Sequence, residues 1–87
     1  MEQSLPDKVE DEILKLVTEL PGISEPHELR TRRIGNHYAI ELHILMDGNI
    51  PLREAHDKAS EVEERLRKQY GEETHVVVHV EPISQST

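Results

Sequence analysis

A period of two residues governs two stretches of this chain, residues 38–46 and 76–81, and a stretch with the period of a helix lies between them. Such alternation is typical of strands that pack one face on a core and leave the other face free. Two strands of one sheet that are joined by a crossover helix run parallel, and the connection is almost always right-handed. The pattern therefore predicts a strand, helix, strand unit with one covered and one open sheet face.

The two predicted helices have apolar stripes at helical spacing and recognisable ends. The first runs from a capping box of Ser4 and Asp7 to a proline and glycine at 21–22. The second carries its apolar stripe over residues 52–70, presents charged residues on its other face and stops at Gly71. Both helices should pack on the covered face of the sheet.

A shorter mixed segment, residues 28–34, precedes the first alternating stretch, and Gly35 with Asn36 favours a hairpin turn between them. The order is then helix, strand, strand, helix, strand. We predict an α+β sandwich with a three-stranded mixed sheet and both helices on one face. It forms a single domain over residues 1–87, with a core from about 7 to 82.

The composition limits the core that this domain can build. Only 34% of its 87 residues are hydrophobic, and just two, Tyr38 and Tyr70, are aromatic. A domain of this size buries only about 60 to 65% of the surface that its unfolded chain exposes, so a partner would supply apolar contact that a monomer lacks. We therefore expect a homodimer.

Charge and cysteine content exclude several partners and chemistries. The formal net charge of -8 repels a polyanion from most of the surface, which argues against nucleic acid binding. The absence of cysteine removes disulfides, thiolate metal sites and thiol nucleophiles, and it fits a reducing compartment. No apolar run approaches the roughly 20 residues of a membrane span, and the amino terminus lacks a secretory signal. We expect a soluble chain without direct membrane insertion, while the sequence leaves open whether Met1 is the native start.

Metal-ligating side chains stand where the open sheet face is predicted. His43, His79 and Glu81 have the phase opposite to the apolar alternates, so they should point to that face together. His79 and Glu81 are two residues apart on one strand, a spacing of roughly 7 Å that one ion can bridge. His27, just before the first strand, would approach from the edge. Neutral imidazoles with a carboxylate suit zinc, iron, manganese, cobalt or nickel, and protonation below about pH 6 would release the metal.

The other histidines have a simpler interpretation. His56 lies beside the apolar stripe of the second helix, near its inner margin, where a buried or interfacial histidine is the usual role and a ligand is the alternative. His37 flanks the hairpin turn and His75 opens the last strand, so we interpret both as surface residues. A solvated histidine on the open face is by itself often plain polar surface. Only the grouping of several favours a metal site.

The sequence does not favour an enzyme. It contains no recognisable relay of serine, histidine and acid, and no glycine-rich phosphate loop. A metal-activated water with Glu81 or Glu41 as base would make a small hydrolase. A domain with two aromatic residues has little material for the closed apolar pocket that substrates require, so we expect no catalysis.

Several segments together resemble one known pattern: residues 22–32, 40–44, 54–56 and 78–82. Over nearly its whole length the chain is similar to the cytoplasmic carboxy-terminal domain of the cation diffusion facilitator family of metal transporters. The resemblance implies a ferredoxin-like (metallochaperone-like) αββαβ fold. It also implies a domain that dimerises on the cytoplasmic side of a membrane, beneath the transmembrane domain of its parent transporter.

The same resemblance implies a ligand set, because His27, His43, His56, His79 and Glu81 match the metal positions of the family. The first ion would take His27 and His43, the second His56 and His79, and Glu81 would bridge both. Metal would then regulate transport by stabilising the closed, transport-competent dimer. The alternatives are a metal-independent dimerisation or docking module and a small metal-dependent hydrolase. The sequence leaves open the physiological metal, the number of ions and the direction of transport. Among the metals, we expect zinc before iron or manganese.

Overall fold

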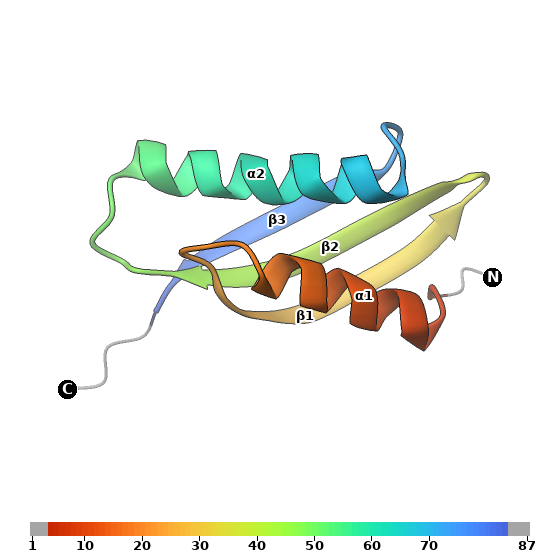
Figure 1. The fold of residues 1–87 in the computed structure, drawn as a ribbon, viewed down its shortest axis with the longest axis horizontal. Helices are drawn as coiled ribbons and strands as arrows, with labels where there is room; N and C mark the ends of the chain where they lie inside the picture. Colours follow the sequence, from red (N-terminus) through yellow and green to blue (C-terminus); the bar gives the residue numbers. More distant parts are fainter. Residues whose placement is uncertain (1–3, 84–87) are drawn as a thin grey trace.

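A computed structural model describes residues 4–83, and its elements follow the predicted order of helix, strand, strand, helix, strand (Figure 1). They are α1 (Asp7–Thr18), β1 (Ser24–Ile34), β2 (His37–Met46), α2 (Leu52–Tyr70) and β3 (His75–Pro82). The two ends of the predicted domain, residues 1–3 and 84–87, lie outside this description. None of the helices within residues 4–83 combines the length and the apolar character that a membrane span requires.

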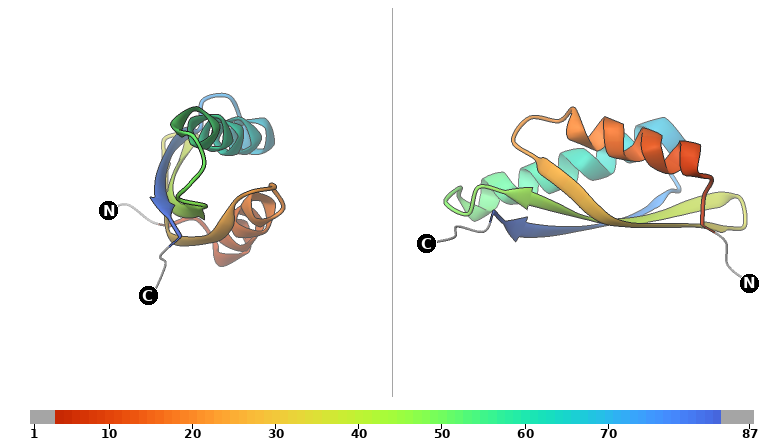
Figure 2. Two further views of the ribbon diagram at one scale, coloured as in Figure 1. Left: turned by 90° about the vertical axis from the view of Figure 1, so that its left-hand side faces the viewer. Right: turned by 90° about the horizontal axis from the view of Figure 1, so that it is seen from below.

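The sheet has β2 at its centre, paired antiparallel with β1 and parallel with β3. Both helices lie on one face of this sheet, and none of the described residues forms a helix on the other face (Figure 2). The predicted α+β fold with a three-stranded mixed sheet is therefore confirmed. The pairing of β2 with β3 runs without a shift from Ala39 opposite His75 to Met46 opposite Pro82, which sets His43 opposite His79.

The core lies between the sheet and the two helices. It is built on β2, where Ile40, Leu42 and Ile44 are at most 1% exposed. The helices contribute further side chains without exposed surface: Ile13 and Val17 from α1, and Val62 and Leu66 from α2. Successive residues of a strand point to opposite faces, so burial of the even-numbered residues of β2 directs its odd-numbered residues to the open face. This alternation places His43 there.

The start of α1 differs from the prediction. Pro6 is the N-cap, and its carbonyl oxygen accepts hydrogen bonds from the backbone N–H groups of Val9 and Glu10 at 2.9 and 3.1 Å. Among residues 4–83, no side chain makes a capping hydrogen bond at this end of the helix. The predicted capping box of Ser4 and Asp7 is therefore wrong, because the N-cap is Pro6 and not Ser4. Asp7 is then the first residue of the helix instead of the third, and its charge favours the helix through the helix dipole.

Strand β1 begins at Ser24, earlier than the predicted segment 28–34, and it is irregular. Its pairing with β2 changes register on both sides of His27. Each change places two residues of β1 opposite one residue of β2, which is the definition of a β-bulge. Glu25 and Glu28 lie in these two bulges and have positive φ angles of 42° and 49°.

The bulges determine which way His27 points. It pairs with His43, and Arg30 pairs with Glu41. In a regular strand two residues separated by three positions point to opposite faces, but the residue inserted between His27 and Arg30 returns both to the open face. The irregularity of β1 is thus what brings His27 beside His43.

Gly22, in the connection between α1 and β1, has a φ of +80°, and a Cβ added there would lie 2.5 Å from Nζ of Lys58. We expect Gly22→Ala to lower the free energy of unfolding by about 1 kcal/mol or slightly more, measured by urea denaturation. Gly35→Ala is the matched control, because Gly35 has a φ of +58° and nothing within 4 Å of an added Cβ. A smaller loss at Gly22 than at Gly35 would contradict a steric contribution from Lys58.

Candidate metal centre

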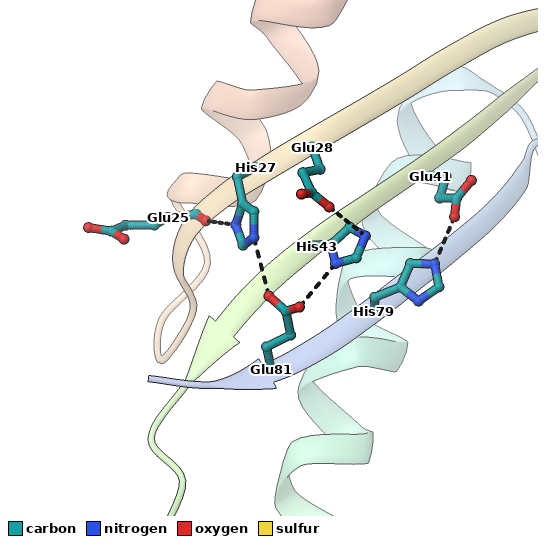
Figure 3. Close-up of polar contacts among 7 residues, drawn as sticks. All are labelled: Glu25, His27, Glu28, Glu41, His43, His79 and Glu81. Atoms are coloured by element: carbon teal, nitrogen blue, oxygen red, sulfur yellow. Dashed lines mark hydrogen bonds and ion pairs between the residues drawn. The ribbon is translucent and has the colours of Figure 1, made fainter. Parts of the chain in front are cut away.

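Four of the five predicted ligands lie together on the open face, near the ends of β2 and β3 (Figure 3). His27 comes from β1, His43 from β2, and His79 and Glu81 from β3. His27 belongs to β1 itself, whereas the sequence pattern placed it before the strand. Three strands thus supply the cluster, and pairing within the sheet fixes their relative positions.

The Glu81 carboxylate lies between two imidazole rings. Its Oε1 is 3.2 Å from Nε2 of His27, and its Oε2 is 3.4 Å from Nδ1 of His43. Two ligands of one tetrahedral zinc ion lie about 3.3 Å apart when each is at an ordinary Zn–N or Zn–O distance. The same spacing therefore suits either an ion pair or a cation shared by the two residues.

A hydrogen bond to the backbone orients His27. Its Nδ1 lies 2.9 Å from the carbonyl oxygen of Glu25, and since a carbonyl only accepts, Nδ1 carries the proton and donates it. The lone pair of neutral His27 is then on Nε2, the nitrogen that faces Glu81. This bond is the main cause that raises the pKa of His27 above its usual value; desolvation opposes it, and the charges of Glu81 and Glu28 add to the increase.

His43 is the centre of the cluster. Its ring stacks on His79 with centroids 4.5 Å apart, and it lies 5.5 Å from the ring of His27. Nε2 is 3.1 Å from Oε2 of Glu28, whereas Nδ1 is buried and makes no hydrogen bond within residues 4–83. A buried nitrogen without a hydrogen-bond partner costs about 1–3 kcal/mol. A cation between Nδ1 and Glu81 would remove that cost.

His79 has a different kind of partner. Its Nε2 is 2.7 Å from Oε2 of Glu41, a hydrogen-bond distance shorter than the spacing of two ligands on one ion. This bond is the largest of the effects that lower the pKa of Glu41. Glu41 therefore orients the ring of His79, as carboxylates commonly do when they bond the free nitrogen of a metal-binding histidine. Nδ1 is then the nitrogen of His79 that would bind a metal.

His56 is not brought to this cluster. It is exposed on α2, which covers the opposite face of the sheet. The predicted place at the inner margin of the helix is wrong, because His56 lies about 120° around the helix axis from the buried Val62. His37 and His75 are exposed, as predicted, and His37 pairs with Glu73 at 3.2 Å.

Sequence reasoning missed Glu28 as a member of the cluster. His27, Glu28 and His43 each offer a ligand atom, and these atoms lie within 4.8 Å of one another. Period-two reasoning assigns the adjacent residues His27 and Glu28 to opposite faces, and only the bulge, which the sequence does not reveal, lets both reach His43. Glu41 was foreseen on the open face as a conceivable base, and its bond to His79 gives it another role.

Comparison with known proteins gives a consistent result. The family described as "Cation efflux protein, cytoplasmic domain" matches residues 5–83. Among curated relatives, the cation-efflux pump FieF of Pectobacterium atrosepticum is 39% identical over 84 residues, which are 97% of this chain and 28% of that protein. The chain thus spans a little over a quarter of the length of the curated relatives that it matches.

Solved structures agree with the fold and the family. The structure of the proposed zinc transporter CzrB has a TM-score of 0.85 and 30% identity, covering 92% of this chain and 99% of that one. The metal-bound C-terminal domain of the CzcD transporter from Thermotoga maritima has a TM-score of 0.79 and 28% identity, covering 92% and 93%. These relatives are transporters or their domains rather than enzymes. The chain therefore belongs to the cation efflux protein family and corresponds to its cytoplasmic domain, with the ferredoxin-like fold that the sequence resemblance implied.

Proposed function

We propose that this chain is the regulatory cytosolic domain of a divalent metal cation transporter, and that it binds metal on the open sheet face at or near a homodimer interface. The observation that carries the proposal is Nδ1 of His43, which is buried, makes no hydrogen bond within residues 4–83 and lies 3.4 Å from Glu81. In this proposal the domain has no catalytic role. It lies on the cytoplasmic side of a membrane, joined to the transmembrane domain of its parent.

His27, His43 and Glu81 would hold the first cation, through nitrogen and oxygen atoms already at the spacing of shared ligands. His79 would bind a second cation with Glu81 as the bridge. His56 can complete that second site only from another copy of the chain, because α2 carries it on the opposite side of the sheet. The ligand set is thus complete only in a dimer.

Exposed apolar side chains support an interface at the same end of the molecule. Leu52, at the start of α2, is 85% exposed. Val80, near the end of β3, and Ile83, just after that strand, are 40% and 43% exposed. The parallel pairing of β2 and β3 brings the end of β3 and the start of α2 to the end where the ligands lie. Burying these side chains against a second copy would supply apolar contact that the small core lacks.

The donor set suits several metals, with zinc first and iron or manganese as alternatives. Imidazole nitrogen is a good ligand for zinc and iron, and carboxylate oxygen extends the range to manganese. Neutral imidazoles supply lone pairs without charge, and the carboxylate offsets part of the charge of a divalent ion. The proposed zinc transporter CzrB and the metal-bound CzcD domain support this choice.

Metal would regulate by shifting a population of dimers. Ligands from two copies bind one cluster only when the copies approach, so metal favours the closed arrangement over the open one. A tenfold preference for the closed form supplies about 1.4 kcal/mol, so the two forms must already be near balance. Small-angle scattering of the domain with chelator and with saturating zinc, at a concentration where both samples are dimeric, tests this. We expect a smaller radius of gyration with zinc in the wild type and no change in His43→Ala, and identical wild-type profiles would contradict the proposal.

The pH dependence of stability should differ between the two states. In chelator, His27 has a raised pKa, so its protonated form stabilises the fold fully below about pH 6.5, and this contribution is lost as pH rises through the higher folded value. We therefore expect the difference in melting temperature between wild type and His27→Gln to be larger at pH 5.5 than at pH 8. With zinc the trend should reverse, because metal binds only the neutral imidazole. The same trend with and without zinc would argue against His27 as a ligand.

A second candidate function is a metal-independent dimerisation or docking module. Each histidine of the cluster already faces a carboxylate, His27 with Glu81, His43 with Glu28 and His79 with Glu41, so ion pairs could satisfy the face without metal. Sedimentation equilibrium in chelator and in zinc separates the two functions. The regulatory proposal expects dimerisation to tighten at least tenfold with zinc, and the docking module expects no change.

A further inference from the structure

We propose that the cluster offers two alternative cation positions on the two sides of the His43 ring, and that Glu28 supplies the ligand on the side away from Glu81. In the second position a divalent cation is held by His27, Glu28 and His43, with no residue of β3. This inference rests on the proposed function, because it assumes that the open face binds metal.

The spacing of Glu28 and His43 suits a cation shared by the two residues as well as an ion pair. Oε2 of Glu28 is 3.1 Å from Nε2 of His43, close to the roughly 3.3 Å between ligands that share one tetrahedral ion. One ligand atom from each of His27, Glu28 and His43 falls within 4.8 Å of the others. The bond from His79 to Glu41, at 2.7 Å, is shorter and belongs to a hydrogen bond instead.

The backbone of β1 is shaped around these residues. Glu25 and Glu28 are the two non-glycine residues with positive φ within residues 4–83. Such a conformation costs of order 1–3 kcal/mol and tends to persist at functional sites. Both residues serve the same pair of histidines, since the carbonyl of Glu25 orients His27 and the carboxylate of Glu28 reaches His43.

The two positions exclude each other at His43. A neutral imidazole has one lone pair, so it binds a cation either through Nδ1 beside Glu81 or through Nε2 beside Glu28. The Glu28 position should therefore be seen most clearly when Glu81 has lost its charge. Two imidazoles and one carboxylate make a donor set that zinc and iron(II) both accept.

The test is zinc titration by calorimetry at 0.15 M salt, which screens general charge effects. Glu81→Gln should still bind one zinc per chain, more weakly than the wild type. Adding Glu28→Gln to that variant should weaken the remaining binding a further tenfold or more. Adding Glu25→Gln instead should change it by less than twofold, and this is a matched control because Glu25 is also acidic, exposed, left-handed and in a bulge of β1.

Equal effects of Glu28→Gln and Glu25→Gln would overturn the inference, as would complete loss of zinc binding in Glu81→Gln alone. Either result leaves the proposed function standing, provided that the wild type binds zinc and His43→Ala does not. If the wild type binds no zinc, both the proposed function and this inference fail. Circular dichroism of each variant should match the wild type, since the side chains of Glu28 and Glu81 are 65% and 46% exposed.

Discussion

Replacing His43 with alanine should weaken zinc binding by about 100-fold or more while leaving the fold intact. His43 contacts a carboxylate on each side of its ring, Glu81 at Nδ1 and Glu28 at Nε2, and it also stacks on His79. Without the His43 ring, each of the two proposed cation positions loses one of its nitrogen ligands. Titration calorimetry of the metal-free domain measures the loss directly.

A thermal shift gives an independent measure of the same effect. A ligand that binds only the folded state stabilises it by about 2.7 kcal/mol at 100 times its dissociation constant. The wild type should therefore gain that stability with zinc, and His43→Ala should gain almost none. The matched control is His37→Ala, because His37 lies on the same strand and also pairs with a glutamate, Glu73, at 3.2 Å. If His37→Ala lost zinc binding as strongly as His43→Ala, the open-face site would be wrong.

Replacing Leu42 with alanine should have the largest effect on stability, lowering the free energy of unfolding by about 3 kcal/mol. Leu42 is next to His43 in the chain, points to the opposite face and has no exposed surface in the centre of β2. Removal of its side chain leaves a cavity between the sheet and the helices. Since small domains are stable by only about 5–15 kcal/mol, this is a large share of the total.

Urea denaturation in chelator measures the loss, and Leu45→Ala is the control. Leu45 is the same residue type on the same strand, but it lies on the open face and is only partly buried. We expect it to lose about 1 kcal/mol. Equal losses at Leu42 and Leu45 would mean that the face of the metal cluster is covered as fully as the face under the helices.

The parts of the fold that the sequence predicted best are those with a regular period. Strand β2 keeps its alternation over its whole length, and β3 pairs with it without a shift, so the direction of His43, His79 and Glu81 followed from counting residues. The bounds of α2 also followed from its apolar stripe between a proline and a glycine.

The parts that could not be predicted depend on contacts between elements. The bulges of β1 arise from its pairing with β2 and from two left-handed glutamates, and neither has a sequence pattern of its own. They decide that His27 and Glu28 both reach His43. The error at His56 has another cause, because its exposure follows from helical spacing. His56 lies six residues before Val62, about 120° around the helix axis, which is outside the apolar stripe.

Anomalous diffraction at the zinc absorption edge, from crystals of the zinc-loaded domain, tests the central claim most directly. We predict a peak on the open sheet face, with atoms of His27, His43 and Glu81 within about 2.0–2.2 Å of it. A zinc peak at His37 and Glu73, or any other position, with none among these three residues would contradict the proposed site.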